Sequence, residues 1–133
     1  FSSDNGGPIY RNGSVGGSNY PLRGGKESNW EGGVRVNAFV GGGAVPGAMR
    51  GTRLDGLIAL WDWYRTLAEG VGGLNEITDE RAAAARLPPL DSINVWPYLT
   101  GKQPLSPRRT LELGASSCVV QSEDCINLGG ESP

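Results

Sequence analysis

Polar and apolar residues alternate between positions 34 and 40, which lie between a glycine pair and a run of three glycines. A repeat of two places every second side chain on the same face of an extended chain. Four apolar side chains would share one face: Val34, Val36, Ala38 and Val40. The pattern therefore predicts a β-strand over residues 34–40.

A second apolar pattern, between positions 55 and 69, has the spacing of an α-helix. Its apolar residues return every three or four positions and fall on one face. They are Leu57, Leu60, Trp61, Tyr64, Leu67 and Ala68. The glycine-rich stretch 70–73 should end this amphipathic helix, because glycine readily adopts the left-handed backbone found at helix C-termini.

Three shorter elements are expected further along the chain. Residues 78–86 should form a short helix with Thr78 as its N-cap, stopped by the two prolines that follow. A turn and a short apolar segment are expected over 91–99, and a strand over 109–113. Strand, long helix and strand in this order favour an α/β fold, in which the helix packs on one face of a mixed or parallel sheet.

The composition predicts a loop-rich chain, because 22 of its 133 residues are glycine and 9 are proline. Hydrophobic residues make up 38% of the chain, which is low for an independent globule. We therefore expect residues 1–113 to complete their core against segments outside this sequence. Residues 114–133 are interpreted as a polar tail of unknown role.

Charge and hydropathy argue against two classes of partner. The chain has 12 Lys and Arg against 14 Asp and Glu, spread along the sequence, which is unlike a nucleic-acid-binding protein. No apolar run reaches the roughly 18 residues that a membrane-spanning helix needs. We expect no nucleic-acid partner and no membrane span in this segment.

Two motifs leave alternatives open. Cys118 and Cys125 could close a small disulfide loop or stay reduced. The tripeptide Asn-Gly-Ser at 12–14 has the pattern of an N-glycosylation site, which matters only on a secretory route. Such a match also arises by chance in a loop of this composition.

The first candidate chemistry lies at the start of the chain, where Asp4 and Asn5 place a carboxylate beside a carboxamide oxygen. Oxygen donors of this kind suit a hard divalent cation such as calcium. Gly6 and Gly7 permit the sharp turn that both side chains need to face one ion. The same four residues are also ordinary turn chemistry. From these residues alone, a metal site and a plain turn both stand.

Several motifs then follow in a fixed order. Asp-Asn-Gly-Gly at 4–7 and a variable loop precede Pro-Leu-Arg-Gly-Gly-Lys at 21–26 and Trp-Glu-Gly-Gly-Val-Arg at 30–35. This order resembles the type I sulfatases, most closely the arylsulfatase B-like group. The later Leu-Ser-Pro-Arg at 105–108 is similar to the approach to the last strand of the same catalytic domain.

The resemblance implies a fold, a reaction and a site. It covers about residues 1–113 and implies the C-terminal part of an alkaline-phosphatase-like sulfatase fold that hydrolyses aryl or carbohydrate sulfate esters. Asp4 and Asn5 match a late pair of calcium ligands, and Lys26 matches a lysine that contacts the substrate sulfate. A lysine ammonium is a compact charge that can reach a sulfate oxygen. Without the resemblance, Lys26 would be interpreted as a surface lysine paired with Glu27.

The resemblance also implies what this chain lacks. The sulfatase nucleophile is a formylglycine made from Cys or Ser followed by x-Pro-Ser-Arg, and neither Cys118 nor Cys125 has these neighbours. The nucleophile should come from missing N-terminal sequence, so the isolated chain should be inactive. The implied substrate is a sulfated small molecule or glycan. The family favours an extracellular, lysosomal or other endomembrane compartment.

Other residues in the matched stretches are interpreted as scaffolding. Arg23, Trp30, Glu31 and Arg35 should hold the glycine-rich loop in place through charge-assisted hydrogen bonds, with Trp30 covering the charged groups. Asp62, in the long helix, is expected to be a solvated or capping residue.

Two other functions stay open. A phosphodiesterase-like member of the alkaline phosphatase superfamily would use the same sheet with different metals. An upstream Thr or Ser without x-Pro-Ser-Arg would identify it. A non-catalytic glycan-binding module would stack Trp and Tyr rings on sugars, and it would bind sulfated glycan without calcium.

Overall fold

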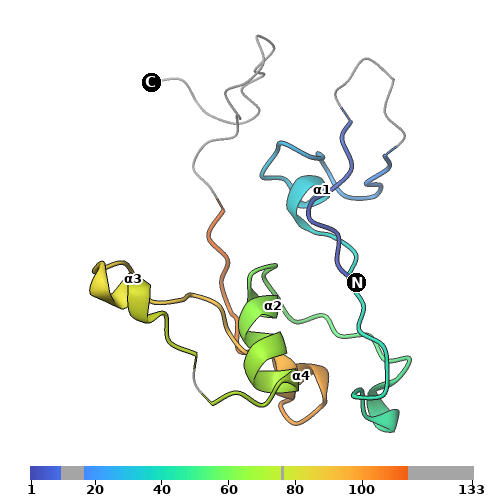
Figure 1. Cartoon of the computed structure of the whole chain (residues 1–133). Coiled ribbons are helices and arrows are strands. Elements are labelled where there is room, and N and C mark those ends of the chain that lie inside the picture. The colour runs from blue at the N-terminus through green and yellow to red at the C-terminus, as the bar shows by residue number, and fades with distance from the viewer. Residues whose placement is uncertain (10–16, 76, 114–133) are drawn as a thin grey trace. The chain divides into compact units, whose positions relative to one another are not determined.

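The structure is a computed structural model that describes residues 1–9, 17–75 and 77–113 (Figure 1). The expected glycosylation motif, both cysteines and the polar tail lie outside the described residues. Contacts divide the described chain into two units. Of the described residues, 1–9, 17–39, 112 and 113 belong to the first unit, and 40–75 and 77–111 belong to the second.

The first unit contains one helical turn, α1 (Glu31–Val34), and one isolated antiparallel bridge between Ser2 and Ala38. The strand predicted over 34–40 is therefore wrong, apart from that bridge. Residues 31–34 instead close a helical turn, in which the Arg35 amide donates to the Glu31 carbonyl at 2.8 Å. The alternating pattern describes an extended chain, but a ladder also needs a neighbouring strand of matching length.

In the second unit, α2 (Asp62–Arg65) continues directly into η2 (Thr66–Val71), a wider turn of the π type. The helix predicted over 55–69 begins too early and ends slightly too early. The glycine stop is confirmed, because Gly73 has a φ of 69° and its amide donates to the Glu69 carbonyl at 3.1 Å.

Three short helical segments complete the second unit: η1 (Gly47–Met49), α3 (Glu80–Ala84) and α4 (Trp96–Leu99). The apolar part of 91–99 ends in α4, which contacts η2. The strand predicted over 109–113 is wrong, since none of those residues lies in a strand. In the described part of the chain, no helix is long and apolar enough to cross a membrane.

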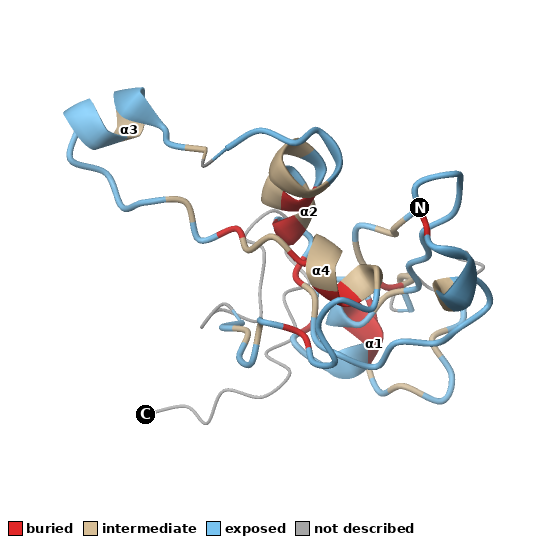
Figure 2. Cartoon of the chain, turned by 90° about the horizontal axis from the view of Figure 1, so that it is seen from below, coloured by how far each residue is buried: buried red, intermediate tan, exposed pale blue. Residues whose placement is uncertain are grey.

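Buried residues of the second unit gather on α2, at the start of η2, in α4 and in the segment before it (Figure 2). The buried apolar residues are Val45, Ala59, Val95 and Tyr98. On the long helix, the fully buried side chains are the polar Asp62 and Thr66. The apolar face is exposed instead, with Tyr64 57% and Leu67 58% accessible. Within this chain, the helix is therefore anchored by its polar side.

The start of α3 is set by Asp79, whose Oδ1 accepts a hydrogen bond from the Ala82 amide at 2.9 Å. The predicted N-cap, Thr78, lies one residue too early. Removing the cap in Asp79→Ala should destabilise α3 by about 1 kcal/mol. Faster amide hydrogen exchange at Ala82 and Ala85 measures the loss. Thr78→Ala is the matched control and should leave exchange unchanged; a larger effect of Thr78→Ala would reverse the assignment.

Candidate functional site

A backbone hydrogen bond joins the segment that carries Asp4 and Asn5 to the segment that carries Lys26. The Lys26 amide donates to the Gly7 carbonyl at 3.1 Å. The backbone of Lys26 is therefore held against Gly7, which follows Asn5 by two residues, although Lys26 itself is far from Asn5 in sequence. The structure thus brings together the two backbone segments that carry the three sequence-predicted site residues.

Glycines make this close approach possible. The Gly6 amide donates to the Gly33 carbonyl at 2.8 Å, and Gly6, Gly25 and Gly33 are all buried. A Cβ on Gly6 would strike the Gly32 carbonyl oxygen, and a Cβ on Gly25 would strike the Gly7 carbonyl oxygen. The glycine motifs therefore let two backbone segments touch, which no other residue type would permit at these positions.

The site side chains have the exposure that a ligand-binding role requires. Asp4 and Lys26 are exposed and Asn5 is half-buried. Oδ1 of Asp4 accepts the Asn5 amide at 2.9 Å. Nδ2 of Asn5 donates to the Gly6 carbonyl at 2.9 Å, which fixes the orientation of the carboxamide.

Asp4 and Asn5 fit calcium as part of a coordination shell. Their carboxylate and carboxamide oxygens are the hard donors that calcium prefers, but the ion takes about six to eight of them. In residues 1–9, 17–75 and 77–113, no group of three or more His, Cys, Asp or Glu side chains is arranged to hold a metal ion. Two donors alone do not complete such a shell, so the calcium site stays a prediction.

The residues interpreted as scaffolding form two separate contacts. The Arg23 guanidinium lies 3.8 Å from the centroid of the Trp30 ring, so Trp30 covers Arg23 as predicted. Arg35 and Glu31 form an exposed ion pair at 3.4 Å, which contributes at most about 1 kcal/mol. At exposed positions such as these, a cation–π contact and an ion pair each contribute at most about 1 kcal/mol.

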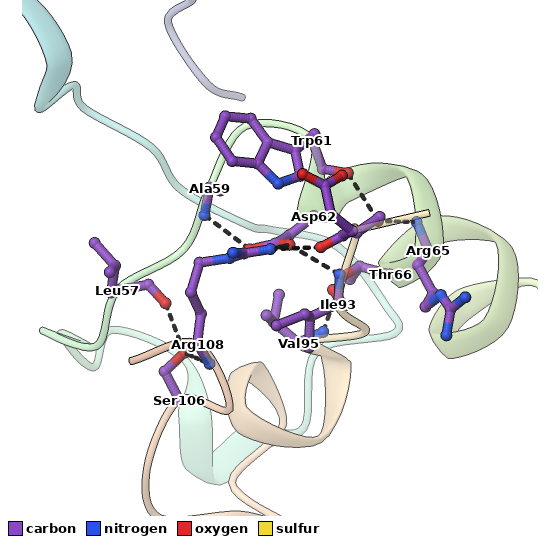
Figure 3. A network of polar contacts seen from close by, with 12 residues as sticks. Leu57, Ala59, Trp61, Asp62, Arg65, Thr66, Ile93, Val95, Ser106 and Arg108 are labelled. Atoms are coloured by element: carbon purple, nitrogen blue, oxygen red, sulfur yellow. Dashed lines mark hydrogen bonds and ion pairs between the residues drawn. The ribbon is translucent and has the colours of Figure 1, made fainter. Parts of the chain in front are cut away.

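A second polar cluster surrounds Asp62 in the second unit (Figure 3). Asp62 is 0% accessible, so the expectation of a solvated side chain is wrong. The expected capping role is wrong as well, because the N-cap of α2 is Trp61 and no described side chain caps the helix. Oδ2 of Asp62 instead accepts the Ala59 amide, at 2.8 Å, ahead of α2. Oδ1 accepts the Ile93 amide at 2.9 Å. Arg108 binds both oxygens through Nε and Nη2, at 2.7 and 2.6 Å.

The charges of this cluster are matched. Burial raises the pKa of Asp62, but the hydrogen bonds from Arg108, Ile93 and Ala59 and the charge of Arg108 outweigh it. The pKa of Asp62 therefore lies below its usual value. The hydrogen bond to Asp62 raises the pKa of Arg108. Both groups stay ionised near neutral pH and are satisfied by each other.

An open hollow lies beside this cluster, and some of the polar groups that line it are already hydrogen-bonded within the chain. Its lining residues are Asp55, Gly56, Leu57, Tyr98, Leu105, Ser106, Arg108 and Arg109. The Tyr98 hydroxyl accepts the Gly56 amide at 2.7 Å, and the Ser106 hydroxyl donates to the Leu57 carbonyl at 2.6 Å. These bonds hold loops together, so the Tyr98 and Ser106 hydroxyls have a structural role.

Comparison with known proteins relates part of this chain to a sulfatase. It is 45% identical over 73 residues to Arylsulfatase J of Mus musculus. The match covers 53% of this chain and spans 11% of the length of that protein. No protein-family model and no solved structure matches the chain. The match supports a sulfatase-like relationship for the part of the chain that it covers.

Proposed function

We propose that this chain is the C-terminal part of a sulfatase catalytic domain of the arylsulfatase B-like group, which hydrolyses aryl or carbohydrate sulfate esters. The observation that carries the proposal is the bond between the Lys26 amide and the Gly7 carbonyl at 3.1 Å. It joins a candidate calcium pair to a candidate sulfate ligand. The 45% identity to an arylsulfatase over 73 residues supports the same reaction class.

Each site residue has one role. Asp4 and Asn5 hold a calcium ion, with the Asn5 carboxamide oriented by its bond to Gly6. When bound, calcium supplies positive charge that stabilises the negative charge developing on the sulfate oxygens. Lys26 binds a sulfate oxygen through its ammonium group, which is on an exposed residue.

The rest of the domain is proposed to lie in sequence outside this chain. It would supply the formylglycine nucleophile and the sheet of an alkaline-phosphatase-like α/β fold. The exposed apolar face of the long helix, which includes Tyr64 and Leu67, suits packing against such a sheet. The intact protein would act in an extracellular, lysosomal or other endomembrane compartment.

Lys26→Ala tests the assignment of the sulfate ligand. Loss of one charge-assisted contact should weaken binding of inorganic sulfate about tenfold or more. Chemical-shift titration of the chain in the presence of calcium measures the change. Lys102→Ala removes an exposed lysine from the other unit and is the matched control. Equal sulfate affinity in both variants would remove Lys26 from the site.

The purified chain should not hydrolyse an aryl sulfate, because it contributes ligands without a nucleophile. A 4-nitrophenyl sulfate assay with added calcium checks this. Turnover that disappears in Lys26→Ala would show that the chain carries its own nucleophile. Binding of a sulfated glycan without any calcium dependence would favour the non-catalytic glycan-binding module instead.

A further inference from the structure

The side chain of Asn19 bridges the two segments of the candidate site. Its Oδ1 accepts the Gly7 amide at 2.7 Å, and its Nδ2 donates to the Gly7 carbonyl at 2.7 Å. The same Nδ2 also donates to the Gly24 carbonyl at 3.1 Å. Asn19 is half-buried, and it lies 12 residues from Gly7 and 5 from Gly24 along the chain.

These three hydrogen bonds end on Gly7 and Gly24, one in each segment of the candidate site. Gly7 lies two residues after Asn5, and Gly24 lies two residues before Lys26. The Gly7 carbonyl accepts both from Asn19 and from the Lys26 amide. The Asn19 carboxamide therefore binds both backbone groups of Gly7 and, through Gly24, ties them to the segment that carries Lys26.

We propose that Asn19 is a positioning residue, which sets the separation between the calcium pair Asp4-Asn5 and the sulfate ligand Lys26. A sulfate oxygen can contact an ion and an ammonium group together only if their separation is fixed. This inference rests on the proposed function. The competing explanation is that Asn19 only stabilises a loop.

Ser28 is a suitable control, because its side chain stabilises the same loop without linking the two segments. Its hydroxyl donates to the Gly25 carbonyl at 2.8 Å and accepts the Gly25 amide at 3.2 Å. These bonds hold the turn around Lys26 but do not reach Gly7. Ser28→Ala should therefore cost loop stability without changing the distance between the two segments.

The experiment uses gadolinium(III), a paramagnetic ion with the oxygen preference of calcium, and the full 133-residue chain. Paramagnetic relaxation of backbone amides falls steeply with distance from the ion. In the unaltered chain, the amides of Gly7 and Lys26 should both relax rapidly, and Asp4→Ala should abolish both effects. Asn19→Ala should keep the effect at Gly7 and lose it at Lys26, whereas Ser28→Ala should keep both.

Slow exchange of the Gly6 amide, which is bonded to Gly33, shows that each variant is folded. If Asn19→Ala loses this protection, the relaxation experiment is repeated with Asn19→Asp. That variant keeps the acceptor for the Gly7 amide and loses only the bonds donated to the Gly7 and Gly24 carbonyls. Loss of protection in both variants would make Asn19 a folding residue and overturn the positioning role.

The remaining outcomes separate the two proposals. Undiminished relaxation at Lys26 in a folded Asn19 variant would overturn the positioning role and leave the calcium assignment intact. If the unaltered chain shows no relaxation around Gly7, the ion is not held by Asp4 and Asn5. The proposed metal site would then fail, and the role of Asn19 would fail with it.

Discussion

Arg108→Met should strongly destabilise the second unit, lowering its free energy of unfolding by about 3–5 kcal/mol. Asp62 is completely buried and takes two hydrogen bonds from Arg108, at 2.7 and 2.6 Å. Without the guanidinium, an ionised carboxylate would be left in the interior with only two backbone amides, from Ala59 and Ile93. A single domain is stabilised by about 5–15 kcal/mol in total, so this loss removes a large fraction of its stability.

The small apolar core makes the second unit sensitive to this change. Its buried apolar residues are Val45, Ala59, Val95 and Tyr98. Urea unfolding followed by far-UV circular dichroism measures the loss, with Arg109→Met as the matched control because Arg109 is the exposed neighbour. Equal midpoints for Arg108→Met and Arg109→Met would show that the buried pair does not hold the unit together.

Lowering the pH should remove part of the stability that the pair of Asp62 and Arg108 contributes. The pKa of Asp62 is lower in the folded chain than in the unfolded chain, so its contribution is fully present above the unfolded pKa. The contribution is lost as the pH falls through the lowered folded pKa. The stability gap between the unaltered chain and Arg108→Met should therefore narrow in acid. A difference in stability that stays constant as the pH falls below the pKa of Asp62 in the folded chain would contradict a stabilising role for the ionised carboxylate.

Gly6→Ala should break the candidate site apart. Its added Cβ would strike the Gly32 carbonyl oxygen, which is backbone and cannot swing away. Overpacking of this kind costs roughly 1–3 kcal/mol, and we expect the upper end because both partners are fixed. The hydrogen bond from Gly6 to Gly33 and the one from Lys26 to Gly7 should both weaken.

Amide hydrogen exchange at Gly6 and Lys26 measures that effect. Gly43→Ala is the control, because a Cβ on Gly43 has no atom within 4 Å. It should be neutral or slightly stabilising, since alanine narrows the unfolded ensemble. Unchanged protection at Lys26 in Gly6→Ala would mean that the two segments do not depend on this close approach.

The order of motifs predicted which residues belong to the candidate site, and their roles as ligands stay predictions. The close approach of the two backbone segments at Gly6, Gly7 and Gly25 was not predicted, because the sequence does not show which segment a glycine will contact. The role of Asn19 could not be predicted. An asparagine in a loop rich in Ser, Gly and Asn carries no periodic signal, and its partners are set only by folding.

Local periodicity also explains which elements were predicted well. The long helix has a strong 3.6-residue pattern, and it forms around residues 62–71. Its polar face could not be predicted as buried, because Asp62 pairs with Arg108, 46 positions away. The strand over 34–40 failed for a related reason, since an alternating pattern does not supply a partner strand and only Ala38 pairs.

The residues encoded before Phe1 test the central claim most directly. Sequencing the transcript upstream in the same reading frame should reveal a Cys or Ser followed by x-Pro-Ser-Arg, the source of the formylglycine that Asp4, Asn5 and Lys26 would serve. An upstream catalytic Thr or Ser without that motif would contradict the sulfatase assignment and favour a phosphodiesterase-like relative.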